Sequence, residues 1–282
     1  MAKQKRIEDY GINIGNFPRG KLNKITDVKG IKVGHCTIDT EENKTGVTVI
    51  LPTEGNIYEE KLIAASYVLN GFGKTTGLIQ IDELGTLESI IALTNTLNVG
   101  IVHDAVVEYT IEECKRINID LTTLNPVICE CNDSYLNNIQ NRAVKKEHVF
   151  KAIENAGLDF EEGDVGAGKG MSCHQLKGGI GSASRIIKLD GRDYTIGVLV
   201  LSNHGALKDL TISGKNIGKD LAEEIDVEPP RDKGSIISIV ATDIPLTSRQ
   251  LKRVLKRTSV GIARVGSYIS HGSGEVIIGF ST

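Results

Sequence analysis

The most reactive chemistry that this sequence could support lies at one peptide bond, between Gly234 and Ser235. A polar segment that opens with two prolines ends at Gly234, and the apolar, β-branched run 236–240 follows Ser235 directly. If this bond breaks, Ser235 becomes an N-terminal residue with a hydroxyl nucleophile and its own amine as a base. Such an amine has a pKa of about 7.7–8.0, which suits a general base near neutral pH. Glycine before the serine tolerates backbone strain and crowds the attack least.

Small polar residues also occur at other strand ends in the C-terminal third. Asn203 follows one predicted strand, and Ser273 and Glu275 open the last one. An asparagine amide can donate a hydrogen bond to a developing oxyanion, which is worth on the order of 3–4 kcal/mol in comparable enzymes. A carboxylate could hold a positively charged amine. Each residue taken alone is more typical of a turn than of a catalytic site, so this set by itself does not decide the function.

A glycine-rich stretch, 163–170, nearly matches the phosphate-binding pattern G-x4-G-K-[ST]. Gly170 stands where a serine or threonine should hold Mg²⁺, and the flanks indicate neither a preceding strand nor a following helix. We therefore expect a flexible or tightly turned loop near a site and no nucleotide.

The five cysteines and six histidines show no disulfide or zinc spacing. Cys129 and Cys131 flank Glu130 inside a predicted strand, which is not a C-x2-C ligand pair, and we expect both thiols to be buried and reduced. The histidines are scattered along the chain, so each is expected at the surface or in a hydrogen bond and not on a metal. A G-x-S-x-G motif is absent from the sequence, and no Ser-His-Asp triad is indicated.

The elements that must position these residues follow from the hydrophobic pattern. Strands are expected at 31–35, 45–51, 89–94, 126–131, 195–202, 235–242 and 274–280. Helices are expected at 98–116, at 147–156 and after a capping box at 247–250, where one apolar face runs to residue 262. Asp190-Gly191 predicts a hairpin turn, and 214–234 a looser connection. Strands and helices mix without a regular βαβ rhythm, which favours a layered α/β sandwich.

Composition limits the partners and the location. The 282 residues carry a net charge of −3 with both signs interspersed, so neither a nucleic acid nor an anionic membrane is indicated as a partner. No stretch approaches the roughly 18 apolar residues that span a bilayer, and residues 1–10 contain no apolar signal region. We therefore expect a cytoplasmic protein built as one large α/β domain.

Several separate blocks, in the right order along nearly the whole chain, resemble the L-aminopeptidase/D-esterase and β-aminopeptidase family. Members of this family are self-processing serine peptidases of the N-terminal-nucleophile-like kind. The blocks are residues 23–35, 45–49, 132–137, 165–168 with 177–181, 201–205, the Gly234-Ser235 junction and 272–282. The glycine-rich block of this family also accounts for the near match to a phosphate-binding loop.

The resemblance implies an αββα-type sandwich of the self-processing aminopeptidase and ornithine acetyltransferase-like kind. It implies one domain that is cut into an α-chain, residues 1–234, and a β-chain, residues 235–282. No cofactor and no metal are implied. Cleaved protomers would assemble into a homo-oligomer, and the substrates would be short peptides, amides or esters.

The resemblance also implies roles for single residues. Ser235 would be the nucleophile that attacks a substrate carbonyl and forms an acyl-enzyme. Asn203 would stabilise the oxyanion, Ser273 and Glu275 would orient the nucleophile, and Tyr135 would line the site. The residues themselves do not separate the roles of Ser273 and Glu275.

Three other functions stay open at this point. One is an acyltransferase on a related self-cleaving scaffold, although that class prefers threonine where this chain has Ser235. Another is a hydrolase of unusual amide oligomers within the same family. The third is a non-enzymatic member that keeps the fold as a binding module, which the complete residue set argues against.

Overall fold

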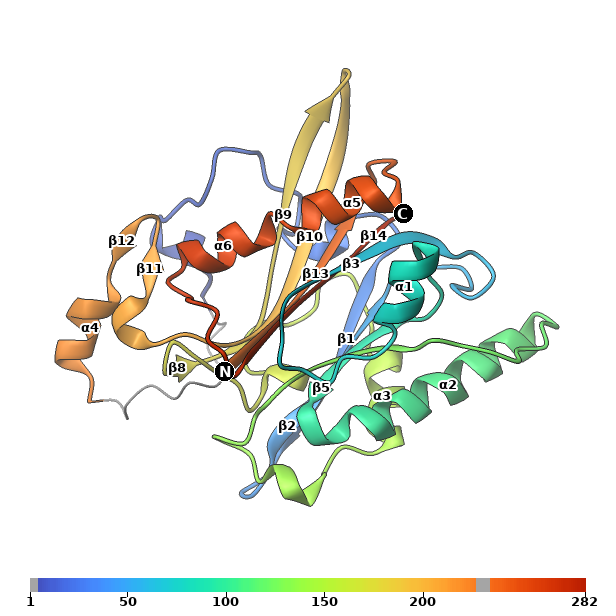
Figure 1. Cartoon of the computed structure of the whole chain (residues 1–282), viewed down its shortest axis with the longest axis horizontal. Coiled ribbons are helices and arrows are strands. Elements are labelled where there is room, and N and C mark those ends of the chain that lie inside the picture. Colours follow the sequence, from blue (N-terminus) through green and yellow to red (C-terminus); the bar gives the residue numbers. More distant parts are fainter. Residues whose placement is uncertain (1–4, 227–233) are drawn as a thin grey trace.

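The computed structural model describes residues 5–226 and 234–282, so the polar run 229–233 before the junction lies outside the described residues. The strands form two large sheets (Figure 1). The four-stranded sheet has the order β1 (Lys32–Asp39), β2 (Lys44–Leu51), β5 (Ile91–Asn95), β6 (Val127–Cys131). The six-stranded sheet has the order β4 (Thr86–Leu87), β3 (Leu62–Gly71), β14 (Ser273–Ser281), β13 (Gly234–Thr242), β10 (Arg192–Asn203), β9 (Gly179–Leu189). Two short ribbons pair β7 (Ser172–Cys173) with β8 (Leu176–Lys177), and β11 (Thr211–Ile212) with β12 (Lys215–Asn216).

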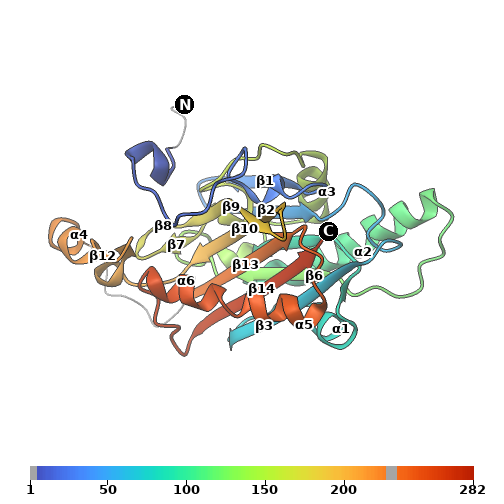
Figure 2. The ribbon, with the colours of Figure 1, turned by 90° about the horizontal axis from the view of Figure 1, so that it is seen from above.

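Helices cover the outer faces of the two sheets. On the four-stranded sheet lie α2 (Val99–Arg116) and α3 (Lys146–Glu154). Against the six-stranded sheet lie α1 (Leu78–Leu84) and α5 (Ser248–Leu255), and α5 continues into α6 (Thr258–Arg264). In Figure 2, α5 and α6 lie on one side of the larger sheet, and β1 and β2 lie on its other side. The predicted αββα sandwich is confirmed.

The main core lies between the two sheets because side chains alternate along each strand. On β13, Ile237 and Ile239 belong to this central core, whereas Val240 packs outward with Leu251 of α5. Ser235 stands two residues before Ile237 and therefore faces the space between the sheets. Alternation on β13 thus places the Ser235 side chain on the inner face of the sheet and the Ser238 side chain on the outer face.

The hairpin between β9 and β10 turns where the sequence predicts it. Asp190 and Gly191 have φ values of 49° and 79°. Positive φ at both central residues is the geometry of a type I′ turn, which matches the twist of the flanking strands. The hairpin projects from the body of the molecule (Figure 1), and its second strand ends at Asn203.

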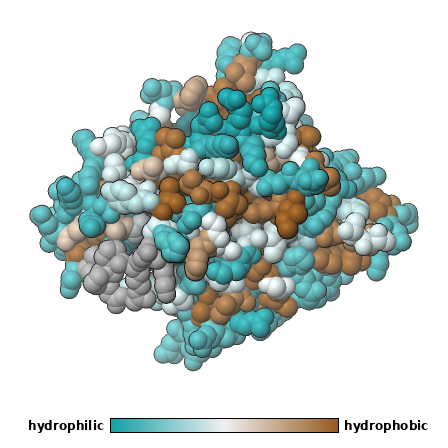
Figure 3. Space-filling view, viewed as in Figure 1, coloured by the Kyte–Doolittle hydropathy of each residue, from teal (hydrophilic) through white to brown (hydrophobic). Residues whose placement is uncertain are grey.

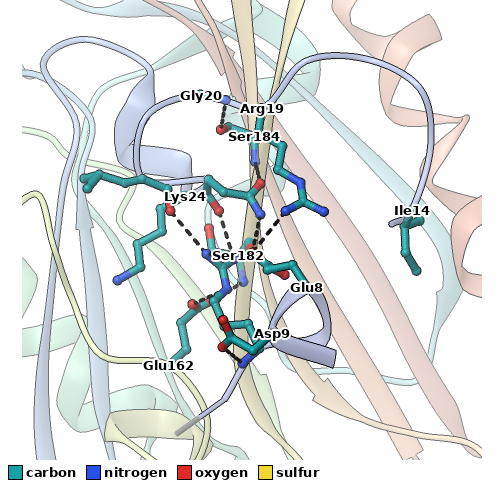
Figure 4. A network of polar contacts seen from close by, with 12 residues as sticks. Glu8, Asp9, Ile14, Arg19, Gly20, Lys24, Glu162, Ser182 and Ser184 are labelled. Atoms are coloured by element: carbon teal, nitrogen blue, oxygen red, sulfur yellow. Dashed lines mark hydrogen bonds and ion pairs between the residues drawn. The ribbon is translucent and has the colours of Figure 1, made fainter. Parts of the chain in front are cut away.

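Polar contacts fasten the segment before β1 to β9 (Figure 4). The Gly20 N–H donates to Ser184 Oγ over 3.1 Å, and the Arg6 guanidinium donates to the Ser182 carbonyl over 2.6 Å. Arg6 also pairs with Glu162 at 3.2 Å. These residues are far apart in the sequence, so the contacts hold the N-terminal segment against the larger sheet.

One helix prediction was wrong. The pattern from 251 to 262 predicts a single helix, but the structure has α5 and α6 with a turn between them. The Thr258 hydroxyl donates to the Leu255 carbonyl over 2.7 Å, and the Ser259 hydroxyl donates to the Lys256 carbonyl over 2.5 Å. These side chains take acceptors that a continuous helix would offer to its own backbone, which interrupts it.

Several elements of the structure were not predicted, among them α1, β3 and α4. β3 pairs with β14 along most of its length, and α4 (Gly218–Glu224) lies within the connection 214–234. Within the described residues, no helix combines the length and apolar character needed to cross a membrane. On the face shown in Figure 3, apolar residues form a broken band across the middle, with hydrophilic residues around it.

Candidate active site

Ser235 lies at the head of a central strand, between β10 and β14. The antiparallel register pairs Ser235 with Asn203, the last residue of β10. The parallel register pairs it with Gly274, the second residue of β14. Regions that are far apart in the sequence therefore meet at one end of the larger sheet. Because paired residues share a face, the Asn203 and Ser235 side chains both project from the inner face.

The Ser235 hydroxyl is buried on this inner face. The residue is 5% exposed, and its Oγ has no hydrogen-bond partner within 5–226 and 234–282. Cys131, at the end of β6 in the opposite sheet, brings its thiol beside Ser235. Burial raises the pKa of this thiol well above its usual value, so the thiol stays uncharged. The hydroxyl thus lies against neutral, weakly polar surroundings.

Two hydrogen bonds fix the Asn203 side chain. Its Oδ1 accepts from the Ser172 N–H over 2.9 Å, and its Nδ2 donates to the Asn132 carbonyl over 2.8 Å. An amide nitrogen carries two hydrogens, so one remains for a ligand. The Lys177 ammonium supports this arrangement, because it donates to the carbonyl that precedes Ser172 and to two others nearby. Burial lowers the pKa of Lys177 to about 8.

Ser273 and Glu275 lie on the neighbouring strand but on the other face of the sheet. They flank Gly274, the partner of Ser235, so alternation turns both side chains outward. There the Ser273 hydroxyl donates to Glu275 Oε1, and Asn70 Nδ2 donates to the Ser273 carbonyl. Glu275 is 0% exposed, and burial raises the pKa of its carboxyl, with the Ser273 hydrogen bond acting in the opposite direction. The pair is a buried acid one strand away from Ser235.

A pocket of about 480 Å³ opens at this end of the sandwich. Four predicted residues line it, namely Ser235, Gly234, Asn203 and Tyr135, whereas the acid pair on β14 does not. Tyr135 stands in the loop after β6 and is 52% exposed. The structure therefore brings the nucleophile and amide candidates together in one cavity and leaves the acid pair behind the sheet.

Glu130, which lies between Cys129 and Cys131 in the sequence, is a pocket residue that was not predicted. It is buried in β6 and lines the pocket. Its carboxylate accepts from the Lys74 N–H over 3.0 Å and from the Thr96 hydroxyl. Lys74 and Thr96 line the same pocket. A signal was present in the sequence, because a carboxylate inside an apolar strand is costly to bury unless other groups pair with it or donate hydrogen bonds to it.

In the glycine-rich block, two carboxylates hold the lysine of the near-match. Lys169, the lysine of the near-match, pairs with Asp39 at 2.8 Å and with Asp164 at 3.1 Å. The same block continues into Ser172 and Gln175, which line the pocket. Of the two loop forms that were expected, the structure has the tight turn, at Gly166–Gly168. Cys129 and Cys131 are buried free thiols, as expected.

An αββα sandwich whose central strand begins with a buried hydroxyl, next to an amide donor and a pocket, has the architecture of the N-terminal-nucleophile hydrolases. Comparison with known proteins narrows this class. The chain belongs to peptidase family S58, whose model matches residues 23–282. With this membership the chain is an aminopeptidase, and the acyltransferase and binding-module alternatives lose their support.

Similar proteins, among them aminopeptidases and solved structures, support this family membership. The β-peptidyl aminopeptidase BapA of Sphingosinicella xenopeptidilytica is 37% identical, over 98% of this chain and 73% of the relative. The crystal structure of the PH0078 protein from Pyrococcus horikoshii OT3 is 51% identical, with a TM-score of 0.93 over 99% of this chain and 79% of that one. The L-aminopeptidase D-Ala-esterase/amidase from Ochrobactrum anthropi, described as a variant of the Ntn hydrolase fold, is 35% identical, with a TM-score of 0.90 over 99% and 78%.

Proposed function

We propose that this aminopeptidase cuts its own chain between Gly234 and Ser235 and then uses Ser235 to hydrolyse N-terminal residues from short peptides, amides or esters. The observation that carries the proposal is the register that pairs Ser235 with Asn203, so that hydroxyl and amide face one pocket. The chain 1–282 would thus mature into two fragments, 1–234 and 235–282, of one domain.

Self-cleavage would begin with attack of Ser235 Oγ on the Gly234 carbonyl carbon. The bond to the Ser235 nitrogen breaks, the nitrogen takes up the hydroxyl proton, and an ester joins the two residues. Water then hydrolyses the ester and leaves a carboxylate on Gly234 and a free amine on Ser235. A side chain at 234 would lie 3.0 Å from the Asn203 carbonyl and 3.1 Å from His204 Cα, which supports glycine at this position.

In turnover, the freed amine would take the proton from Ser235 Oγ as the oxygen attacks the carbonyl of the first substrate residue. The remaining N–H of Asn203 Nδ2 would donate to the oxyanion. The amine then gives its proton to the leaving group, an acyl-enzyme forms, and water releases the product acid. These steps need only groups that line the pocket.

Besides a nucleophile, an aminopeptidase needs a group that binds the N-terminal ammonium of its substrate, and Glu130 can supply it. A substrate with a free N-terminus carries an ammonium group close to the bond that is cut. Glu130 presents a buried carboxylate to the same pocket as Ser235. Its contacts with Lys74 and Thr96 fix its orientation. We assign Glu130 to the substrate ammonium because a carboxylate has further lone pairs to accept its hydrogens.

Ser273 and Glu275 would act on Ser235 through its main chain. Their side chains lie on the face opposite the hydroxyl, so the backbone nitrogen is the part of Ser235 that they can influence. That nitrogen becomes an amine after cleavage and is charged in part of the catalytic cycle. A buried carboxylate one strand away would stabilise this charge. Tyr135, on the open side of the pocket, would contact the substrate.

The test is the mass of the purified chain under denaturing conditions. Wild-type protein should yield the fragments 1–234 and 235–282, whereas Ser235→Ala should stay intact and hydrolyse nothing. Ser238→Ala is the matched control, because Ser238 is a buried serine on the same strand whose side chain lies on the other face; it should cleave and work normally. Full-length wild-type chains with intact activity would refute the mechanism.

Substrate range, assembly and location stay predictions. A panel of p-nitroanilides with L-, D- and β-residues would separate peptide substrates from unusual amide oligomers. A homo-oligomer of cleaved protomers is expected, and light scattering measures it directly. Cell fractionation tests the cytoplasmic location.

A further inference from the structure

A cluster of sulfur and imidazole groups lies beside the pocket, at Cys173, His174 and His204. Each residue offers one ligand atom, and the three atoms lie within 4.8 Å of one another. Cys173 ends β7, His174 follows it in the turn to β8, and His204 follows Asn203 at the end of β10. The His174 and His204 rings meet edge to face with their centroids 5.3 Å apart.

Each of the two imidazoles presents a nitrogen atom that no residue in the described part of the chain satisfies. His174 Nε2 and His204 Nδ1 are buried and have no hydrogen-bond partner within 5–226 and 234–282. The residues are 4% and 5% exposed. Buried polar atoms are normally paired, because leaving one unpaired costs about 1–3 kcal/mol. Two such atoms side by side, next to a thiol, point to a ligand that accepts electron pairs.

The tautomer of His174 follows from its other nitrogen. His174 Nδ1 lies 3.0 Å from the carbonyl oxygen of Ala206. A carbonyl only accepts, so Nδ1 carries the hydrogen and Nε2 presents its lone pair. Imidazoles that bind metals are commonly held in this way, with one nitrogen on a carbonyl and the other on the ion.

The backbone around the cluster is also held in an unusual form. His174 has a φ of 49°, and its N–H donates to the His204 carbonyl over 2.7 Å. Gly205 has a φ of 87°, and a side chain there would lie 2.4 Å from the His174 ring. A positive φ at a histidine costs energy and persists where the surroundings enforce it. The fold therefore fixes the two rings against each other.

We propose that Cys173, His174 and His204 bind one soft or borderline divalent ion, with Zn²⁺ as the ion that this ligand set fits best. One thiolate and two neutral imidazoles match its preference, and the fourth position would be left to water. Bonds of about 2.0–2.3 Å would require ligand atoms about 3.5 Å apart, so the short turn between β7 and β8 has to close slightly. Binding would release the thiol proton to solvent.

A Zn²⁺ titration of chelator-treated protein against a chromophoric competitor tests this site. Wild-type protein should bind one ion per chain, and Co²⁺ should give the absorption of a thiolate-bound ion. Cys173→Ala and His174→Asn should each weaken Zn²⁺ binding by at least about ten-fold. Even the loss of a residue that only hydrogen-bonds a metal ligand lowers metal affinity by about that factor. Cys173→Ala should also lose the thiolate band.

Cys36→Ala is the matched control, because Cys36 is likewise a half-buried free cysteine and lies on β1, away from the cluster. It should keep both the affinity and the cobalt spectrum. Thermal unfolding of each metal-free variant shows whether it is folded. If one of the two ligand variants does not fold, the Zn²⁺ affinity of the other still tests the site. The proposal would be overturned if wild-type protein bound Zn²⁺ no more tightly than both ligand variants. It would also be overturned if Cys36→Ala alone removed the thiolate band of the Co²⁺ spectrum.

Discussion

Ser235 carries its hydroxyl into a buried part of the fold where, among the described residues, it lies beside the Cys131 thiol and gains no close hydrogen bond. An unpaired buried hydroxyl costs about 1–3 kcal/mol, and Ser235 Oγ has no partner in the described part of the chain. Cleavage would change this, because the new amine on the same residue can accept the hydroxyl proton. A local feature that reduces stability and serves a reaction is expected at functional residues and not in an ordinary core.

Asn203 allows the oxyanion role to be tested with two substitutions. Asn203→Ala removes the whole amide, whereas Asn203→Asp keeps an oxygen for the Ser172 N–H and loses the donor. Both should lower kcat by about 10²–10³-fold, because the lost bond forms in the transition state. Rates are measured per cleaved chain, since the same amide can assist self-cleavage. Wild-type kcat in a folded Asn203→Asp variant would exclude this role.

Glu275 predicts a pH dependence of stability. Burial raises the pKa of its carboxyl, so the folded chain retains a proton that the unfolded chain releases as pH rises. Stability from this group is therefore present at low pH and is lost on the way to neutral pH. Glutamine mimics the protonated form. In the uncut Ser235→Ala background, Glu275→Gln should be more stable at neutral pH, with the difference shrinking toward about pH 4.

Urea denaturation of the two chains at several pH values measures this difference. Glu275→Gln keeps an oxygen that accepts from the Ser273 hydroxyl, so changes in packing stay small. A difference that is constant with pH, or that grows toward acid, would contradict a raised pKa. In the cleavable chain the same substitution should lower activity, because the amine of Ser235 loses its nearby negative charge.

At the scale of the elements, the start of β14 is tightly packed, because the chain at Phe72 passes close to Gly274. A side chain at Gly274 would lie 2.7 Å from the Phe72 carbonyl, and Phe72 lines the pocket. Gly274→Ala should therefore lower the free energy of unfolding by about 1–3 kcal/mol through overpacking. Gly261 of α6 is the matched control, since a methyl group there meets nothing within 4 Å.

Gly261→Ala should instead stabilise the chain by about 0.5–1 kcal/mol, because glycine is unfavourable inside a helix. Urea denaturation of both variants measures the two effects side by side. Equal effects of the two substitutions would mean that the crossing at Gly274 is not tight.

The elements also show how much could be predicted from sequence. Local signals were sufficient for the hairpin at Asp190, the capping box at Thr247 and the strand that begins at Gly234. β3 was missed because its centre, Ala-Ala-Ser, is a weak strand former whose pairing with β14 is set by tertiary contacts. The break between α5 and α6 depends on side-chain hydroxyls that periodicity does not register.

The candidate site likewise has parts that could be predicted from the sequence and parts that could not. Ser235 and Asn203 were predicted from strand ends and resemblance, and strand register, which sequence does not give, places them on one face. Register also puts Ser273 and Glu275 on the opposite face. The cluster at His174 and His204 was missed because its ligands come from a turn and a strand end that meet only in the fold.

At the scale of the whole molecule, the proposed cut divides the chain into two fragments that pack together in one fold. Strand order β4-β3-β14-β13-β10-β9 places both strands of fragment 235–282 in the middle of the larger sheet. Ile237, Ile239 and Phe280 from this fragment belong to the central core, together with residues of both sheets. Removing the fragment would expose that core and leave β3 and β10 each with one unpaired edge, β3 beside β4 alone and β10 beside β9 alone, so the two fragments should remain one folded unit.

Size-exclusion chromatography followed by a denaturing gel tests this expectation. Cleaved wild-type protein should elute in one peak that contains both fragments, at the volume of intact Ser235→Ala. Fragment 1–234 expressed alone should fail to give a cooperative unfolding transition, because two central strands and their share of the core are missing. Its co-expression with 235–282 should restore the fold. Independent elution of the smaller fragment from an active enzyme would show that β13 and β14 do not hold the molecule together.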